Sequence, residues 1–160
     1  MPPKSNRPRR EAAVRDLKLN LRHFVVELLV SSYEATEDVG VNPTDLGSLC
    51  LLLLHGPAPA GRLAELTGLT TGAVTGVIDR LEKIGYARRT PDPNDRRRVR
   101  VEVTPTFYRA AEPLWGPMAA EWQSMLARRF TIEELERITA FLRATNDLAR
   151  RHLDRLRNTP

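Results

Sequence analysis

The amino-acid sequence predicts a mainly α-helical protein with one small β-hairpin. Apolar residues recur every three or four positions over long stretches of the 160 residues, as they do on the buried faces of helices. Two short helical patterns flank Gly68, a residue that readily takes the backbone angles of a tight turn. The turn formers at 91–95 then join two short strand patterns. A helix-turn-helix followed directly by a hairpin is a winged helix-turn-helix.

The N-terminal part predicts an arm followed by two helices. Residues 1–10 are rich in proline and basic residues and have almost nothing to bury, so a disordered basic arm is expected. From about 11 to 36 a helical pattern has an unusually wide apolar band, which predicts burial against more than one partner. Asn42 and Pro43 form a strong start signal for a second helix, which is expected to end at Gly56.

The second helix is apolar throughout, which predicts a core position. Cys50 is therefore expected to be a buried small hydrophobe. A redox-sensing thiol is the alternative, but no neighbour in sequence would lower its pKa. His55 is expected to interact with the dipole at the helix end, and lining a pocket is its alternative. A single cysteine excludes an intramolecular disulfide framework and favours a reducing cytoplasm.

Residues 58–104 predict the winged helix-turn-helix itself. Thr70 is expected to cap the second helix of the motif by accepting a hydrogen bond from a free backbone N–H. Gly85 is expected to end that helix in a left-handed conformation. The hairpin strands are predicted at 87–90 and 98–103. The buried stripe of the second helix is predicted to be Val74, Val77, Ile78 and Leu81.

The C-terminal part predicts two long helices. Thr104 is expected to cap the first, at 106–130, in which Pro113 and Pro117 should kink or break the helix because each removes a backbone donor. Thr131 is expected to cap the last helix in a near capping box, with two glutamates in the first turn.

The terminal segments 11–40 and 105–157 have more apolar residues than the neighbouring parts of one chain are expected to cover. We therefore predict that they form a helical dimerisation layer, and their packing on each other within one chain is the alternative. On this interpretation residues 11–160 form a single domain, with the winged helix at 58–104 inside it.

Charge supports a nucleic-acid partner. The formal net charge is +5, and the pI of about 10.0 exceeds the value of roughly 9 that is typical of nucleic-acid binders. Six arginines lie between Arg88 and Arg100 against two aspartates, so the hairpin carries much of the excess. A solvated charged face is the alternative. The position of the charge beside a helix-turn-helix favours DNA.

Three motifs support a family resemblance: DRLEK followed by Gly85, the PDPNDRR tip of the hairpin, and the Val103-Thr104 exit into the next helix. With these motifs the chain resembles the MarR family of transcriptional regulators. The resemblance implies a homodimeric, ligand-responsive regulator, most often a repressor, that binds a pseudo-palindromic double-stranded DNA operator in the cytoplasm. It also implies that Asp95 holds the wing and that Arg97 inserts into DNA. A winged helix used for protein–protein assembly is the alternative.

The residues expected to contact DNA lie on the second helix of the motif and on the wing. Threonine hydroxyls and methyls can meet base edges, and glycines allow close backbone approach. Arginine at a hairpin tip suits a narrow minor groove, while neighbouring basic residues contact phosphates. For Arg80 and Lys83 the alternative is a solvated charge. The predicted DNA-binding residues are Thr70, Thr71, Gly72, Thr75, Gly76, Arg80, Lys83, Asp95, Arg96, Arg97 and Arg98.

The resemblance also implies a small aromatic or otherwise apolar effector. Apolar walls with a few polar groups suit such a ligand, and a plain core role is the alternative for each residue. The predicted effector-binding residues are Phe24, Leu28, His55, Trp115, Met118 and Trp122.

Catalytic and metal-binding motifs are not recognisable. The three histidines are far apart without zinc-ligand spacing, and neither a phosphate loop nor a nucleophile elbow occurs. We therefore predict no enzyme activity, no metal and no cofactor. No apolar run approaches the roughly 20 residues that span a bilayer, so no membrane partner is expected.

Overall fold

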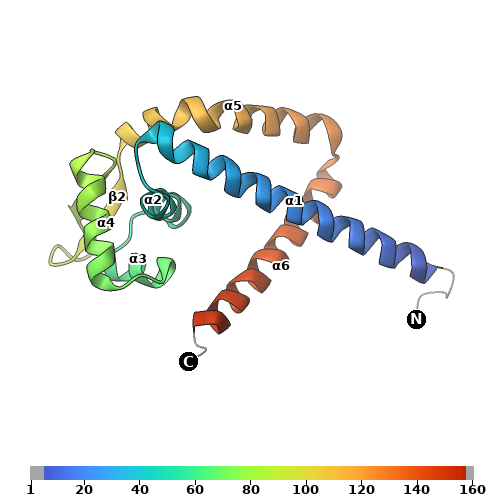
Figure 1. Cartoon of the computed structure of the whole chain (residues 1–160), viewed down its shortest axis with the longest axis horizontal. Helices are drawn as coiled ribbons and strands as arrows, with labels where there is room; N and C mark the ends of the chain where they lie inside the picture. Colours follow the sequence, from blue (N-terminus) through green and yellow to red (C-terminus); the bar gives the residue numbers. More distant parts are fainter. Residues whose placement is uncertain (1–5, 158–160) are drawn as a thin grey trace. The chain divides into compact units, whose positions relative to one another are not determined.

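The computed structural model describes residues 6–157 (Figure 1). The described part is mainly helical with one antiparallel hairpin, which confirms the predicted fold class. Two compact units are present, Met1–Gly47 and Ser48–Pro160. Their boundary falls inside one helix, and the single domain over 11–160 stays a prediction. The elements are α1 (Arg7–Val39), α2 (Pro43–His55), α3 (Ala60–Thr67), α4 (Thr71–Lys83), β1 (Ala87–Pro91), β2 (Val99–Val103), α5 (Pro105–Arg129) and α6 (Ile132–Arg157).

The first unit consists mainly of α1, which begins earlier than the sequence predicted. Residues 7–10 form its first turn instead of part of a disordered arm, and the first five residues of that arm lie outside the described residues. A proline in the first turn costs no hydrogen bond, and Arg7 pairs with Glu11 at 3.0 Å. Gly40 ends the helix at φ 69°. The buried residues of α1 are confined to its last turns and are Ala35, Thr36 and Val39.

The predicted start of α2 is confirmed. The Asn42 side chain accepts a hydrogen bond from the Asp45 backbone N–H at 2.9 Å and donates one to the Asp45 carboxylate at 3.0 Å. These hydrogen bonds cap the first turn of the helix and also give the buried Asp45 carboxylate a donor.

The core of the second unit is built by α2, α3, α4, β2 and α5. The predicted stripe of α4 is confirmed, because all four of its members are buried. Figure 1 shows α3 and α4 together with the hairpin beside α4. The core side chains that are at most 2% exposed include Leu49, Leu63, Val74, Val77, Ile78, Leu81, Val101 and Phe107.

The hairpin pairs β1 with β2 in register from Ala87↔Val103 to Pro91↔Val99. A further bridge, which the sequence did not predict, joins β2 to the segment before α3. There Ala58 and Val101 exchange two backbone hydrogen bonds, of 3.1 and 2.8 Å. This bridge ties the wing to the start of the helix-turn-helix.

The turn between α4 and β1 confirms one predicted cap and corrects another. Gly85 has φ +77°, as a left-handed C-terminal cap requires. Thr104, however, makes no capping bond to α5. Its hydroxyl donates instead to the Gly85 carbonyl at 2.5 Å, and its backbone N–H donates to the Tyr86 carbonyl at 2.9 Å. The start of α5 is thereby fixed to the end of α4.

The two C-terminal helices are continuous. Neither Pro113 nor Pro117 breaks α5, since each proline removes one backbone hydrogen bond from a helix of 25 residues. In α6 the capping box is complete, because Thr131 and Glu134 exchange hydrogen bonds of 3.3 and 2.9 Å. No residue of α6 is buried.

The last turn of α6 reaches the helix-turn-helix. The Arg157 guanidinium donates hydrogen bonds to the backbone carbonyls of Glu65 at 2.8 Å and Leu66 at 2.9 Å. These carbonyls end α3, where a positive charge is favourable. None of the described helices combines the length and apolar character that a bilayer crossing requires.

Candidate nucleic-acid interface and effector pocket

The exposed face of α4 begins at its capped N-terminus. The Thr70 hydroxyl accepts a hydrogen bond from the Ala73 backbone N–H at 3.3 Å, so this predicted cap is confirmed. Thr71, Gly72 and Thr75 are exposed beyond it. The Thr75 hydroxyl donates to the Thr71 carbonyl at 3.0 Å. Toward a ligand, Thr75 therefore offers its methyl group and acceptor lone pairs.

Small residues on α4 leave room for a basic side chain. A Cβ atom placed on Gly76 would lie 3.5 Å from Nη1 of Arg80, so the guanidinium lies along the helix surface over this glycine. Lys83 is exposed in the last turn of the same helix. Both charges also suit the negative end of the α4 dipole.

The wing tip is held in shape by Asp95. Its carboxylate accepts a hydrogen bond from the Arg97 backbone N–H at 3.0 Å, and its carbonyl accepts one from the Arg98 N–H at 2.8 Å. Its carboxylate also pairs with Nε of Arg98 at 3.4 Å. This fixes the direction in which the tip leaves the hairpin.

The arginines of the tip differ in their partners. Arg98 is paired with Asp95, whereas Arg96 and Arg97 have no ion pair within the described part of the chain. Both of these side chains are exposed. The tip therefore presents two positive charges that are not neutralised by the protein, as a phosphate-rich partner requires.

A second charged cluster joins the hairpin to α4, and the sequence did not predict it. The guanidinium of Arg89 on β1 donates to Asp79 at 2.8 Å and also to Glu82, while its backbone N–H donates to Glu82 at 2.7 Å. The hydrogen bond with Asp79 raises the pKa of Arg89 above its ordinary value. The cluster fixes β1 against the C-terminal half of α4.

Arg89→Ala is expected to weaken DNA binding about fivefold to tenfold, because it loosens the wing and leaves two carboxylates unpaired near the phosphates. Fluorescence anisotropy with a DNA fragment selected by the unaltered protein measures the effect. Arg151→Ala removes the same charge from α6 and is the control. If the two variants bind equally well, the cluster has no part in DNA binding.

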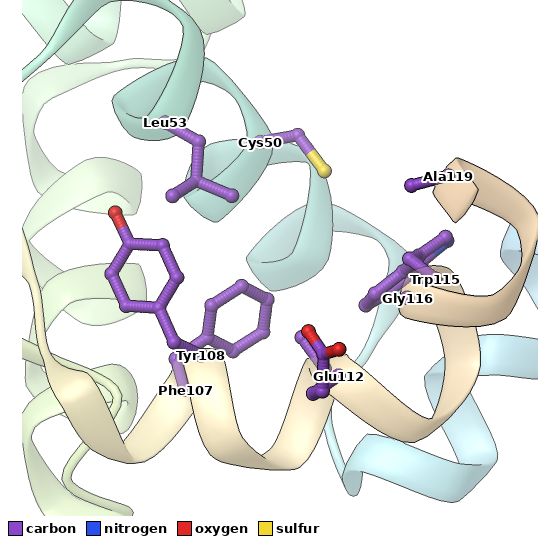
Figure 2. A pocket seen from close by; sticks show the side chains of 9 residues that line it. Cys50, Leu53, Phe107, Tyr108, Glu112, Trp115, Gly116 and Ala119 are labelled. Carbon is purple, nitrogen blue, oxygen red and sulfur yellow. The ribbon is translucent and has the colours of Figure 1, made fainter. Parts of the chain in front are cut away.

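A cavity of about 390 Å³ lies between the second half of α2 and the first half of α5 (Figure 2). Its volume falls in the range of small-molecule sites. Side chains of the two helices face each other across it, and Phe107 contributes its floor. The residues lining it are Cys50, Leu53, Phe107, Tyr108, Ala111, Glu112, Trp115, Gly116 and Ala119.

Trp115 is the member of the predicted effector set that lines this cavity. His55, Met118 and Trp122 are exposed elsewhere on the second unit, while Phe24 and Leu28 belong to the first unit. Sequence reasoning missed the rest of the lining. A signal was present, because residues 107, 111, 115 and 119 form one i, i+4 row along α5, and 108, 112 and 116 form the next.

The prediction that Cys50 is buried is wrong, because Cys50 is exposed and lines the cavity. Leu49 and Leu52 supply the core face of α2, and Cys50 lies on the neighbouring face. The cavity walls still partly desolvate the thiol, which raises the pKa of Cys50.

Cys50 is expected to react slowly with a thiol reagent at neutral pH, since a raised pKa leaves less of the nucleophilic thiolate. The rate of iodoacetamide labelling, followed by mass spectrometry, should rise with pH to a midpoint above that of free cysteine, about 8.5. A midpoint below that of free cysteine would contradict this environment. Within residues 6–157, no group of three or more His, Cys, Asp or Glu side chains is placed to hold a metal ion.

Known proteins with similar sequences are transcriptional regulators. A model of the MarR family matches residues 41–99. The uncharacterized HTH-type transcriptional regulator YcgE of Bacillus subtilis is 42% identical over 123 residues, which cover 77% of this chain and 79% of that protein.

Solved structures have the same fold. A transcriptional regulator from Thermotoga maritima is similar with a TM-score of 0.59 at 25% identity, over 88% of this chain and 98% of its own. Two structures of MepR from Staphylococcus aureus, both at 18% identity, have TM-scores of 0.66 and 0.52, and the second is bound to an oligodeoxyribonucleotide. They cover 83% of this chain and 96% and 97% of their own. The chain belongs to the MarR family of winged helix-turn-helix transcriptional regulators.

Proposed function

We propose that this protein is a homodimeric repressor that binds a pseudo-palindromic DNA operator and releases it when a small ligand is bound. The observation that carries the DNA-binding part is the wing tip. Arg96 and Arg97 project from a turn that Asp95 holds, without an ion pair to any residue of 6–157, and this turn lies on the same unit as the exposed face of α4. The oligonucleotide bound to MepR, a protein of the same fold, supports this assignment.

In this proposal α4 enters the major groove and the wing enters the adjacent minor groove. Thr71 and Thr75 meet base edges and thymine methyls, and Gly72 and Gly76 allow the backbone to come close. Arg97 inserts into the minor groove, where narrow A·T tracts have the strongest negative potential. Arg80, Lys83 and the other wing arginines contact phosphates and contribute affinity with little sequence information.

The exposed apolar residues of the long helices support a dimer. Leu142, Leu153 and Leu156 of α6 are exposed although they belong to an apolar stripe, and no residue of α6 is buried. Exposed apolar faces of this length are unusual on a monomer. A second copy that covers them would have two-fold symmetry, which accounts for a pseudo-palindromic operator.

Contacts at the cavity floor supply a route from ligand to wing. The rings of Phe107 and Tyr86 lie edge to face with centroids 5.3 Å apart, and Tyr86 directly precedes β1. A ligand that displaces Phe107 therefore acts on the base of the hairpin. Such a ligand lowers DNA affinity only if it binds the conformation that does not fit DNA more tightly.

The experiment is a selection of genomic fragments on the full chain, followed by anisotropy with the enriched sequence at about 50 and about 200 mM salt. Six to ten phosphate contacts lower the affinity by roughly 10³ to 10⁵ between these conditions. Enrichment of one sequence with a steep salt dependence supports the proposal. Failure to enrich any fragment favours the protein–protein assembly module instead.

A further inference from the structure

The cavity between α2 and α5 has an asymmetric charge. Eight of the nine residues that the structure places in its lining are uncharged at neutral pH, and Glu112 is the exception. Within residues 6–157 the Glu112 carboxylate has no ion pair. No described lining residue supplies a positive charge that could balance an anion in the cavity.

The backbone of α5 allows the carboxylate to lie at the cavity. Gly116 follows Glu112 by one helical turn, and a Cβ atom on Gly116 would overlap the Glu112 carboxyl group. The carboxylate therefore lies close against the helix surface beside this glycine (Figure 2). Both residues belong to the lining.

Three aromatic side chains line the same cavity as this carboxylate. Phe107 is buried, Trp115 is half-buried with its ring centroid 6.4 Å from that of Phe107, and Tyr108 is exposed at the rim. The faces of aromatic rings attract cations, and a carboxylate also favours a positively charged ligand. Leu53 and Ala119 complete the apolar wall.

We propose that this cavity selects an organic cation with apolar or aromatic substituents, held between the Glu112 carboxylate and the aromatic side chains. The inference rests on the effector site of the proposed function and names the ligand class of that site. An anionic phenolic ligand would meet Glu112 without a compensating positive group. The thiol of Cys50 stays neutral at neutral pH and does not alter this balance.

Tetraphenylphosphonium and tetraphenylborate test the proposal because they have the same shape and opposite charge. Binding to the full chain is measured by titration calorimetry. The net charge of +5 attracts the anion, so nonspecific binding works against the expected result. We expect the cation to bind roughly tenfold more tightly than the anion, since a cation–π contact and a partly exposed ion pair each contribute modestly.

The source of the preference is tested with Glu112→Gln, which keeps the size of the side chain and removes its charge. This variant should lose most of the cation preference. Glu121→Gln, on the same helix but outside the lining, makes the same change in net charge and should bind like the unaltered protein. Fluorescence of Trp115 in a Trp122→Phe background should change on binding, which places the probe in the cavity.

The proposal is overturned by equal binding of both probes, by tighter binding of the anion, or by an equal loss in the Glu112 and Glu121 variants. Absence of binding by either probe would also overturn it, as would be expected if a second copy of the chain filled the cavity. DNA affinity without probe is measured in parallel. Binding of the cation without binding of DNA would contradict only the proposed function. Binding of DNA without binding of the cation would contradict only this inference.

Discussion

Leu142→Glu is expected to convert the protein from a dimer to a monomer and to lower its DNA affinity by about 100-fold or more. Leu142 lies on the apolar stripe of α6 and is 44% exposed in the single chain. A charge buried between two copies would lack a partner. In a dimer the two subunits bind the two half-sites of the operator together, and joining two binding units in this way raises the affinity by roughly 10² to 10⁴. A monomer loses this gain.

The matched control for this variant is Ala140→Glu. It introduces the same residue two positions earlier, on the opposite side of the helix, because two residues correspond to about 200° of helical rotation. Light scattering coupled to gel filtration gives the mass of each variant, and circular dichroism shows that each remains helical. A Leu142→Glu protein that stays dimeric would place the interface away from this stripe.

Arg97→Ala is expected to weaken operator binding by about 1–3 kcal/mol, the contribution of one lost groove contact. The reason is its position on the turn that Asp95 holds, with a side chain exposed and without an ion pair in the described residues. The fold should be unchanged, because the hydrogen bond to Asp95 comes from the Arg97 backbone. Anisotropy with the selected operator measures the loss.

Arg96→Ala separates a specific contact from a general loss of charge. It removes the same charge from the neighbouring position, and a phosphate contact there should weaken operator and unrelated DNA alike. Arg97→Ala should instead reduce the preference for the operator. Equal effects of the two variants on all sequences would assign Arg97 to the phosphates.

Features set by neighbours along the chain were predictable from the sequence. The buried stripe of α4, the Thr70 cap and the Gly85 turn depend on residues within one or two helical turns, and all three are confirmed. The position of Asp95 at the wing tip was implied by a motif, and its hydrogen bonds hold that turn.

Features that depend on pairing between distant segments were not predictable. Arg89 meets Asp79 and Glu82 only because the folded chain packs β1 against α4. The sequence around Ala58 has no strand pattern that would predict its bridge to β2. The prediction for Cys50 was wrong because the residues around it in α2 are apolar on all sides of the helix. Periodicity therefore could not separate the core face from the face that lines the cavity.

The contact of Arg157 with the end of α3 has a practical consequence for engineered versions of this protein. The guanidinium donates to two carbonyls in the last turn of α3 and lies against Gly68, which forms the turn of the helix-turn-helix. A reporter or affinity tag fused closely behind α6 would therefore begin beside the DNA-binding motif. A spacer of flexible residues after that helix would preserve the contact and keep the fused domain away from the surface that is proposed to meet DNA.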